Sequence, residues 1–202
     1  MSNGMLSRWK ELPIVSGALV AVNVVVYFLC MFNGGRLYSL GSLSVSGVLE
    51  RREYGRVLWA MFLHSGMAHI FNNMLILFFM GAMIEKEIGH ICFALLYFLS
   101  GIGGNLCSLF FKVVNSDSSG SIGASGAIFG LDGVLLAMVL LSGRKMETAT
   151  PARVFAMILL SLYNGFSSDN IDNAAHVGGL VVGFLGGCAV CAVQRVRQNG
   201  RQ

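Results

Sequence analysis

Side chains on three apolar segments of the sequence are of the types that hydrolyse amide bonds. Ser125 lies in the string "GASG", and a serine hydroxyl needs a base to take its proton. The neutral imidazole of His176, in "AHVGG", can be that base and then the acid for the leaving amine. His69, Asn73 and the backbone N–H of Ser125 can donate hydrogen bonds to the oxyanion of a tetrahedral intermediate. These residue types predict nucleophilic catalysis by a serine.

Small residues surround the predicted nucleophile. Gly123 and Gly126 would let the chain turn tightly and let a substrate backbone come close, and Ala124 would leave Ser125 uncovered. We therefore expect Ser125 to lie at an accessible helix start.

Two aspartates lie near this set in the sequence, and neither is assigned as a third catalytic member. Asp132 falls two turns deeper than Ser125 on the same helical stripe, and Asp172 lies in the loop four residues before His176. The prediction is therefore a Ser–His dyad. Asp132 has no assigned role; we expect it to be protonated or hydrogen-bonded between helices.

The chain that carries these residues has the composition of a membrane protein. Of its 202 residues, 55% are hydrophobic and 12% are charged, whereas a soluble domain has about 25% charged residues. Uncharged runs of about 18 residues or more predict membrane-spanning helices. We predict an all-α membrane protein, a single domain over residues 1–202, with a non-helical first loop at 33–55. Its six transmembrane helices are expected at 12–32, 57–84, 88–111, 124–143, 151–168 and 173–194.

Basic residues predict the orientation of the spans, because loops rich in Lys and Arg stay cytoplasmic. With both termini in the cytoplasm, most of the unbalanced basic residues fall on that side: Arg8, Lys10, Lys86, Arg144, Lys145, Arg153, Arg195, Arg197 and Arg201. The net charge of +4 is then a topology signal, and it does not indicate a nucleic-acid partner.

This topology predicts that the polar residues meet. The second, fourth and sixth spans all run inward from the non-cytoplasmic side, so residues near their N-termini lie at a similar shallow depth. His69 and Asn73 are four residues apart and share one helix face. They can therefore converge with Ser125 and His176.

Glycines on the fourth and sixth spans predict that these two helices pack closely, because small residues let backbones approach. The sixth span repeats them every four residues, and the fourth span offers a matching set: Gly179, Gly183 and Gly187 against Gly126, Gly130 and Gly133. His176 continues the stripe one turn earlier, so packing would bring it to Ser125.

In these motifs the sequence resembles the rhomboid family of intramembrane serine proteases. "GASG" resembles the family's GxSG nucleophile motif with Ser125, and "AHVGG" its AHxxG element with His176. "HSGMAHIFNN" resembles the HxxxxHxxxN pattern and carries His64, His69 and Asn73. The three motifs stand in the family's order on the second, fourth and sixth spans.

The resemblance implies a serine endopeptidase in the lipid bilayer. It would cleave single-pass membrane proteins near the non-cytoplasmic end of their helix, with no cofactor and no metal. It also implies supporting roles for Arg56 in the first loop and for Glu85, which matches a glutamate that ties that loop to the second helix. Phe129 stands where bacterial members commonly have a tyrosine packed on the catalytic histidine, so the ring is kept and the hydroxyl lost.

Two other interpretations remain open at this stage. A catalytically inactive rhomboid-like protein that binds membrane clients would be expected to lack the serine or the histidine. A small ion or proton transporter could line its path with His64, His69 and Asp132, and it would tolerate Ser125→Ala.

The remaining signals concern the compartment. All five cysteines fall within predicted spans, so we expect no disulfide framework. The N-terminus shows neither a cleavage site nor an amphipathic, arginine-rich presequence. This favours a plasma or secretory-pathway membrane and leaves the mitochondrial inner membrane open.

Overall fold

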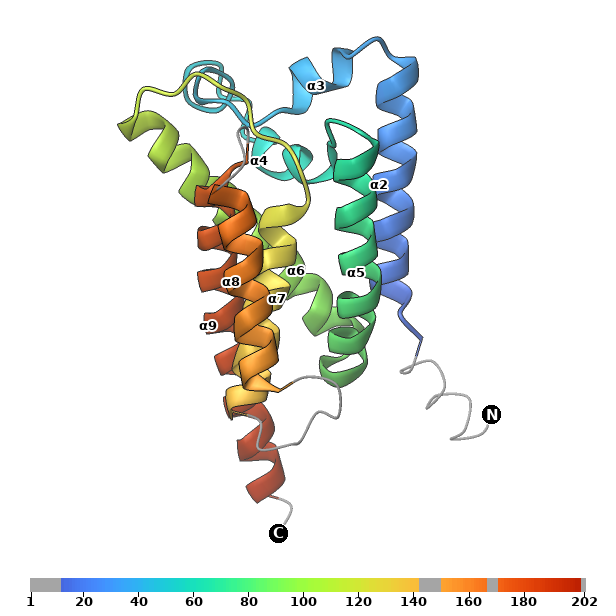
Figure 1. The fold of residues 1–202 in the computed structure, drawn as a ribbon, viewed down its shortest axis with the longest axis vertical. Helices are drawn as coiled ribbons and strands as arrows, with labels where there is room; N and C mark the ends of the chain where they lie inside the picture. Colours follow the sequence, from blue (N-terminus) through green and yellow to red (C-terminus); the bar gives the residue numbers. More distant parts are fainter. Residues whose placement is uncertain (1–11, 142–149, 167–170, 201–202) are drawn as a thin grey trace.

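The computed structural model describes residues 12–141, 150–166 and 171–200, and almost all of its regular structure is helical (Figure 1). Within these ranges only one isolated β-bridge occurs, between Leu43 and Ser121. The elements in chain order are α2 (Ile14–Phe32), α3 (Arg36–Gly41), the π-helical turn η1 (Ser46–Glu50), α4 (Arg56–Trp59), the 3₁₀ turn η2 (Ala60–Phe62), α5 (Met67–Ile88), α6 (His90–Val114), α7 (Ser125–Leu141), α8 (Pro151–Phe166) and α9 (Asn173–Asn199).

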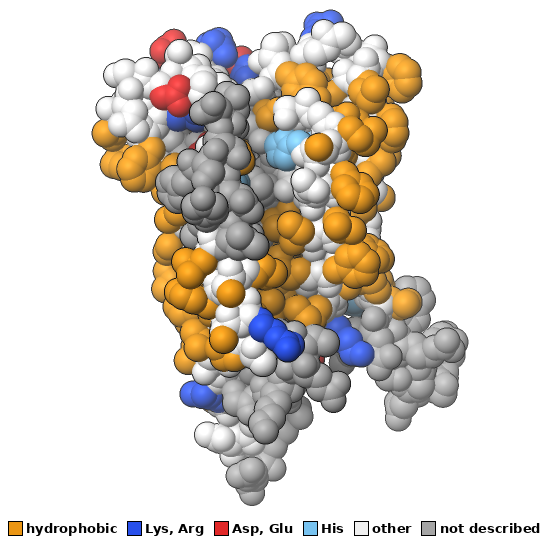
Figure 2. Space-filling view, in the orientation of Figure 1, with side chains coloured by type: hydrophobic (Ala, Val, Ile, Leu, Met, Phe, Trp, Pro, Cys, Tyr) orange, Lys and Arg blue, Asp and Glu red, His pale blue; other side chains and the backbone are white. Residues whose placement is uncertain are grey.

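Four of these helices, α2, α5, α6 and α9, are long and apolar enough to cross a membrane. Helix α7 is a shorter apolar helix of 17 residues, and α8 has 16. Figure 2 shows hydrophobic side chains over the middle of the molecule, with charged side chains above and below them. The fold is therefore a helical membrane bundle, and the protein is an integral membrane protein.

Helix α7 lies in the middle of the bundle (Figure 1). It contacts α5, α6, α8 and α9, and every residue from Gly126 to Leu135 is buried. A helix that is apolar on all sides can be buried on all sides. Asp132 is the exception in this apolar stretch, and it is only 4% exposed.

The predicted continuous helix over 57–84 is wrong at its start. The chain forms α4 and η2, becomes extended at Leu63 (φ −92°, ψ 141°) and at Gly66 (φ −177°), and begins α5 only at Met67. Tyr38 of α3 contributes to this break, because its hydroxyl donates a 2.6 Å hydrogen bond to the carbonyl oxygen of His64. A hydrogen bond from a distant segment thus holds the extended chain where hydropathy alone predicted a helix.

The other helix ends lie closer to expectation. Helix α2 begins two residues later than predicted, α6 covers His90–Val114 rather than 88–111, and α9 continues to Asn199 instead of ending at 194. The predicted ends of the fourth and fifth spans, at 143 and 168, lie outside the described residues.

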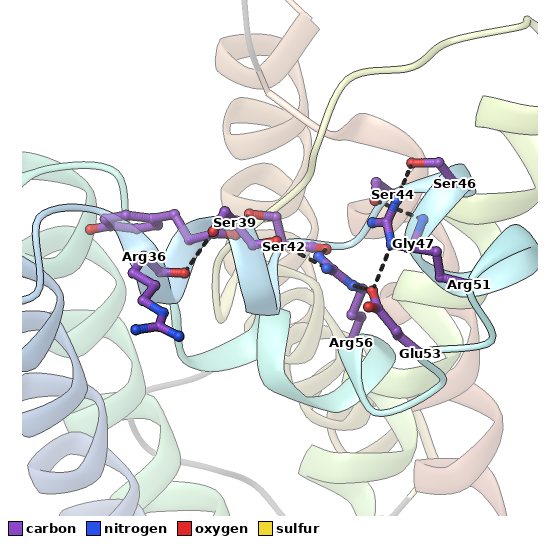
Figure 3. A network of polar contacts seen from close by, with 10 residues as sticks. Arg36, Ser39, Ser42, Ser44, Ser46, Gly47, Arg51, Glu53 and Arg56 are labelled. Atoms are coloured by element: carbon purple, nitrogen blue, oxygen red, sulfur yellow. Dashed lines mark hydrogen bonds and ion pairs between the residues drawn. The ribbon is translucent and has the colours of Figure 1, made fainter.

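The first loop, predicted as non-helical over 33–55, contains α3 and η1 and is organised around Arg56 (Figure 3). The Arg56 side chain is 5% exposed. Its guanidinium donates to Glu53 Oε2 at 2.6 Å and to the carbonyl oxygens of Ser42 and Ser39, each at 2.9 Å. The hydrogen bond from Arg56, and to a lesser extent that from Arg51, lowers the pKa of the Glu53 carboxyl. Residue 47 must be a glycine, since a Cβ on Gly47 would lie 2.6 Å from the Cδ of Arg56.

The role expected of Glu85 is wrong. Its carboxylate contacts the start of α2 rather than the first loop. It accepts hydrogen bonds from the backbone N–H groups of Val15 and Ser16, at 2.8 and 2.9 Å, and from the Ser16 hydroxyl at 2.7 Å. His90 Nδ1 lies 2.5 Å from Oε1, the oxygen that also accepts the Val15 N–H. A carboxylate at a helix N-terminus satisfies free N–H groups and the helix dipole, so Glu85 ties α2 to α5 at the end of the bundle away from the first loop.

Helices α7 and α9 touch backbone to backbone along their glycines. A Cβ on Gly179 would overlap the carbonyl oxygen of Gly126, and one on Gly183 would overlap that of Gly130. Further along, a Cβ on Gly187 would lie 2.8 Å from the Cβ of Ala137. The two helices can approach this closely only because side chains are absent from the seam.

This seam generates a test of the fold. Gly183→Ala places a methyl group against the Gly130 carbonyl, and we expect it to destabilise the protein by about 1 to 3 kcal/mol, the usual cost of overpacking. Gly17→Ala in α2 is the matched control, because its Cβ would meet nothing within 4 Å. Unfolding in detergent, followed by circular dichroism, measures both. Equal stability of the two variants would contradict the seam.

Candidate active site

Ser125 is the first residue of α7, and the segment before it is held to the first loop. Ser121 and Leu43 exchange two backbone hydrogen bonds of 2.9 Å, and the Gly123 N–H donates to the carbonyl oxygen of Ala60 at 2.9 Å. Gly123 adopts φ +135°, which an L side chain rarely adopts. The glycine therefore provides the turn that presents Ser125 at the helix start.

Ser125 and His176 lie within hydrogen-bond distance of one another. The Oγ of Ser125 is 2.8 Å from the Nε2 of His176, across the seam between α7 and α9. The Phe129 ring stacks on the imidazole with centroids 4.2 Å apart and planes at 16°. When Nε2 accepts the serine proton, Nδ1 carries the ring's own proton, and no described residue accepts a hydrogen bond from Nδ1. Within the described chain this is a pair without a third carboxylate.

The start of α9 is fixed by Asp172, one turn before His176. Its Oδ1 accepts the Ala175 N–H at 3.0 Å, and its Oδ2 accepts the hydroxyl of Ser108 from α6. An aspartate three residues ahead of a helical N–H is an N-cap, a signal that sequence reasoning could have used. No pattern in the sequence pointed to Ser108.

His69 of α5 lies beside Ser125, and Asn73 follows it one helical turn later on the same helix. A Cβ built on Gly123 would lie 2.9 Å from His69 Nε2 and 3.6 Å from Ser125 Oγ, so both atoms border the space that this glycine leaves open. Asn73 is 7% exposed, and its Nδ2 has no hydrogen-bond partner among the described residues. An unused buried donor one turn after His69 is the kind of group that could hydrogen-bond to an oxyanion.

The other predicted site residues fall into two groups. His64 and Ala124 adjoin His69 and Ser125, whereas Arg56 and Glu85 contact other parts of the fold. His64 is fully buried, and its ring lies 5.0 Å from that of His69 at 65°. Ala124 is also fully buried. Arg56 organises the first loop, and Glu85 lies at the opposite end of α5.

No residue in the described part of the chain forms an ion pair with Asp132. Its Oδ1 accepts no hydrogen bond from any residue in the described ranges. The predicted hydrogen bond between helices is therefore not seen at this oxygen. The five cysteines are free, and no three His, Cys, Asp or Glu side chains of the described chain are grouped as a metal site would require.

Comparison with known proteins assigns the chain to a family. The Rhomboid domain family model matches residues 51–193. The rhomboid protease GluP of Bacillus subtilis (strain 168) is 36% identical over 184 residues, which cover 88% of this chain and 35% of GluP. RHOMBOID-like protein 4 of Arabidopsis thaliana is 36% identical over 150 residues, or 74% of this chain and 37% of that protein.

The chain therefore belongs to the Rhomboid family, whose members include membrane-embedded proteases. It spans between about a third and a half of the length of the curated relatives that it matches. The Arabidopsis protein named inactive RHOMBOID-like protein 8 is also similar, at 34% identity over 148 residues, or 72% of this chain and 40% of that protein. Family membership alone therefore does not decide whether a member is active.

The stacked ring beside the imidazole generates a prediction. Phe129→Leu keeps an apolar side chain but removes the flat surface against His176, so we expect a serine-directed fluorophosphonate to label the protein about two- to ten-fold more slowly, as for loss of one aromatic contact. Phe129→Tyr keeps the ring and serves as the control. Equal labelling rates for both variants would show that the stacking does not orient the imidazole.

Proposed function

We propose that this chain is an intramembrane serine protease that hydrolyses peptide bonds through a dyad of Ser125 and His176. The observation that carries the proposal is the 2.8 Å approach of Ser125 Oγ to His176 Nε2. A hydroxyl at this distance from a neutral imidazole can transfer its proton as it attacks a carbonyl carbon. Family membership and the similarity to a rhomboid protease support the same reaction.

The residues around the dyad fit the steps of amide hydrolysis. As the Ser125 oxygen bonds to the carbonyl carbon, its proton passes to His176 Nε2 and the carbonyl oxygen becomes an oxyanion. The Ser125 backbone N–H, His69 and Asn73 would donate hydrogen bonds to that oxygen. His176 then returns the proton to the leaving amine as the C–N bond breaks. Water, activated by the same histidine, hydrolyses the acyl-enzyme and frees Ser125.

The substrates that we propose are single-pass membrane proteins, cleaved near the non-cytoplasmic end of their helix. The position of the dyad along the bundle supports this cleavage site. Ser125 and His176 lie in the first turns of α7 and α9, at the end of the bundle where the first loop lies (Figure 1). The opposite end carries Lys and Arg side chains on the face drawn in Figure 2, as a cytoplasmic face would. The proposal includes six spans in one domain, cytoplasmic termini, no cofactor or metal, and a plasma or secretory-pathway membrane.

The two rival functions make different demands on the same residues. A client-binding protein without activity has no need for a serine within hydrogen-bond distance of a histidine. A proton path through His64, His69 and Asp132 has no need for one either. The Ser125–His176 geometry favours the protease over both.

Removal of either dyad member tests the proposal. The purified protein in liposomes should release a fragment from a single-pass substrate and react with a serine-directed fluorophosphonate. Ser125→Ala removes the nucleophile and His176→Ala removes the base, so we expect neither variant to cleave, and Ser125→Ala not to be labelled. Cleavage by either variant at the wild-type rate would refute the dyad.

Asn73 and its neighbour Asn72 offer a matched pair for the oxyanion site. Asn73 is buried with a free Nδ2, whereas Asn72 on the same helix is exposed. We expect Asn73→Ala to lower kcat by about 10²- to 10³-fold, the usual effect of losing one oxyanion donor, and Asn72→Ala to leave kcat unchanged. Initial rates on the liposome substrate measure both. An unchanged kcat in Asn73→Ala would make this residue a packing element.

A further inference from the structure

We propose that Ser65 is a positioning residue that holds His69 in the tautomer with its proton on Nε2, the ring nitrogen that borders the open space beside Ser125. The inference rests on the proposed function, because it concerns how His69 becomes an oxyanion donor. It assigns a role to a residue at a variable position of the HxxxxHxxxN pattern.

The backbone N–H and the hydroxyl of Ser65 both contact Nδ1, the ring nitrogen of His69 that faces away from the open space. The Ser65 backbone N–H donates to Nδ1 at 3.5 Å, and the Ser65 Oγ lies 3.1 Å from the same atom. A backbone N–H can only donate, so Nδ1 must present its lone pair. The hydroxyl, which can donate or accept, then donates as well. A neutral imidazole with an accepting Nδ1 carries its single proton on Nε2.

The tautomer matters because Nε2 borders the open space beside Ser125. Nε2 lies 2.9 Å from the place where a Cβ of Gly123 would be, and Ser125 Oγ lies 3.6 Å from that place. The space is free because Gly123 has no Cβ, and its positive φ disfavours any residue with a side chain at this position. An Nε2–H faces the space beside the nucleophile as a donor, whereas the opposite tautomer would present a lone pair to a developing oxyanion and repel it.

The break between η2 and α5 places Ser65 where it can do this. The chain is extended at Leu63 and Gly66, so Ser65 precedes α5 and lies four residues before His69. The His64 ring packs edge-on against the His69 ring, 5.0 Å between centroids, and limits its rotation. Had the helix continued through residues 57–84, the Ser65 N–H would have bonded within that helix and been unable to reach His69.

The test combines a measurement of the tautomer with a measurement of the rate. Ser65→Ala leaves only the 3.5 Å backbone hydrogen bond on Nδ1, Ser65→Thr keeps the hydroxyl, and Ser118→Ala removes another exposed hydroxyl from a residue outside the site. The chain has four histidines, so ¹³C-histidine labelling of the protein in bicelles allows the Cδ2 shift of His69 to be assigned with a His69→Gln variant. This shift distinguishes the two tautomers and does not depend on turnover.

We expect the His69 Cδ2 shift of the Nε2–H tautomer in the wild type, in Ser65→Thr and in Ser118→Ala. In Ser65→Ala it should move toward that of the Nδ1–H tautomer, and kcat should fall about three- to ten-fold at unchanged KM, as for loss of one hydrogen bond. Ser65→Thr should restore kcat to within about two-fold of the wild type.

The outcomes separate this inference from the proposed function. An active enzyme in which Ser65→Ala changes neither the shift nor kcat overturns the role of the Ser65 hydroxyl and leaves the protease intact. A lower kcat with an unchanged shift also overturns it, because the effect would then not pass through the tautomer. If the wild type cleaves nothing while the shift depends on Ser65, the protease proposal fails and the control of the tautomer stands.

Discussion

The close contact between α7 and α9 is the constraint on which the rest of the molecule depends. Glycines on both helices allow backbone atoms to meet where any side chain would collide. Ser125 and His176 stand at one end of this seam, so the distance between their reacting atoms follows from how closely the helices approach. Lipid surrounds a membrane bundle with an apolar solvent, so such contacts must come from shape and van der Waals packing rather than from the hydrophobic effect. Small residues along the seam are therefore as necessary to the site as the polar residues at its end.

Around this seam, buried or half-buried polar side chains hold segments that hydrophobicity alone does not order. Arg56 donates hydrogen bonds to carbonyl oxygens of the first loop. Asp172 caps α9 and also accepts a hydrogen bond from α6. Glu85 does the same for α2 at the other end of the bundle. Each of these side chains forms hydrogen bonds with backbone groups, and leaving such groups unpaired away from water costs free energy. The site thus lies between a rigid helical seam and a loop held by charge-assisted hydrogen bonds.

Two polar atoms of the site have no hydrogen-bond partner among the described residues. Asn73 Nδ2 and His176 Nδ1 lack a hydrogen-bond partner there, although both residues are mostly buried. A buried donor without a partner is unfavourable in the resting protein. The free Nδ2 of Asn73 suits the oxyanion proposed for the reaction, whereas His176 Nδ1 lies on the side of the imidazole that faces away from Ser125. Asp132 is also buried and unpaired at Oδ1, but it lies two turns along α7, and nothing in the structure connects it to this chemistry.

Sequence alone determined the chemical groups, their order along the chain, the membrane class and the facing glycine stripes, because helical periodicity and span length depend only on local spacing. It also placed His69 and Asn73 on one helix face. The tertiary structure decided what depends on contacts between distant segments: the partner of Glu85, the break before Met67, and the hydrogen bond of Ser108 to Asp172. Ser65 belongs to this second group. Its position in the sequence resembles that of any polar residue near a helix start, and only the extended backbone at Gly66 allows both of its donors to reach one nitrogen of His69.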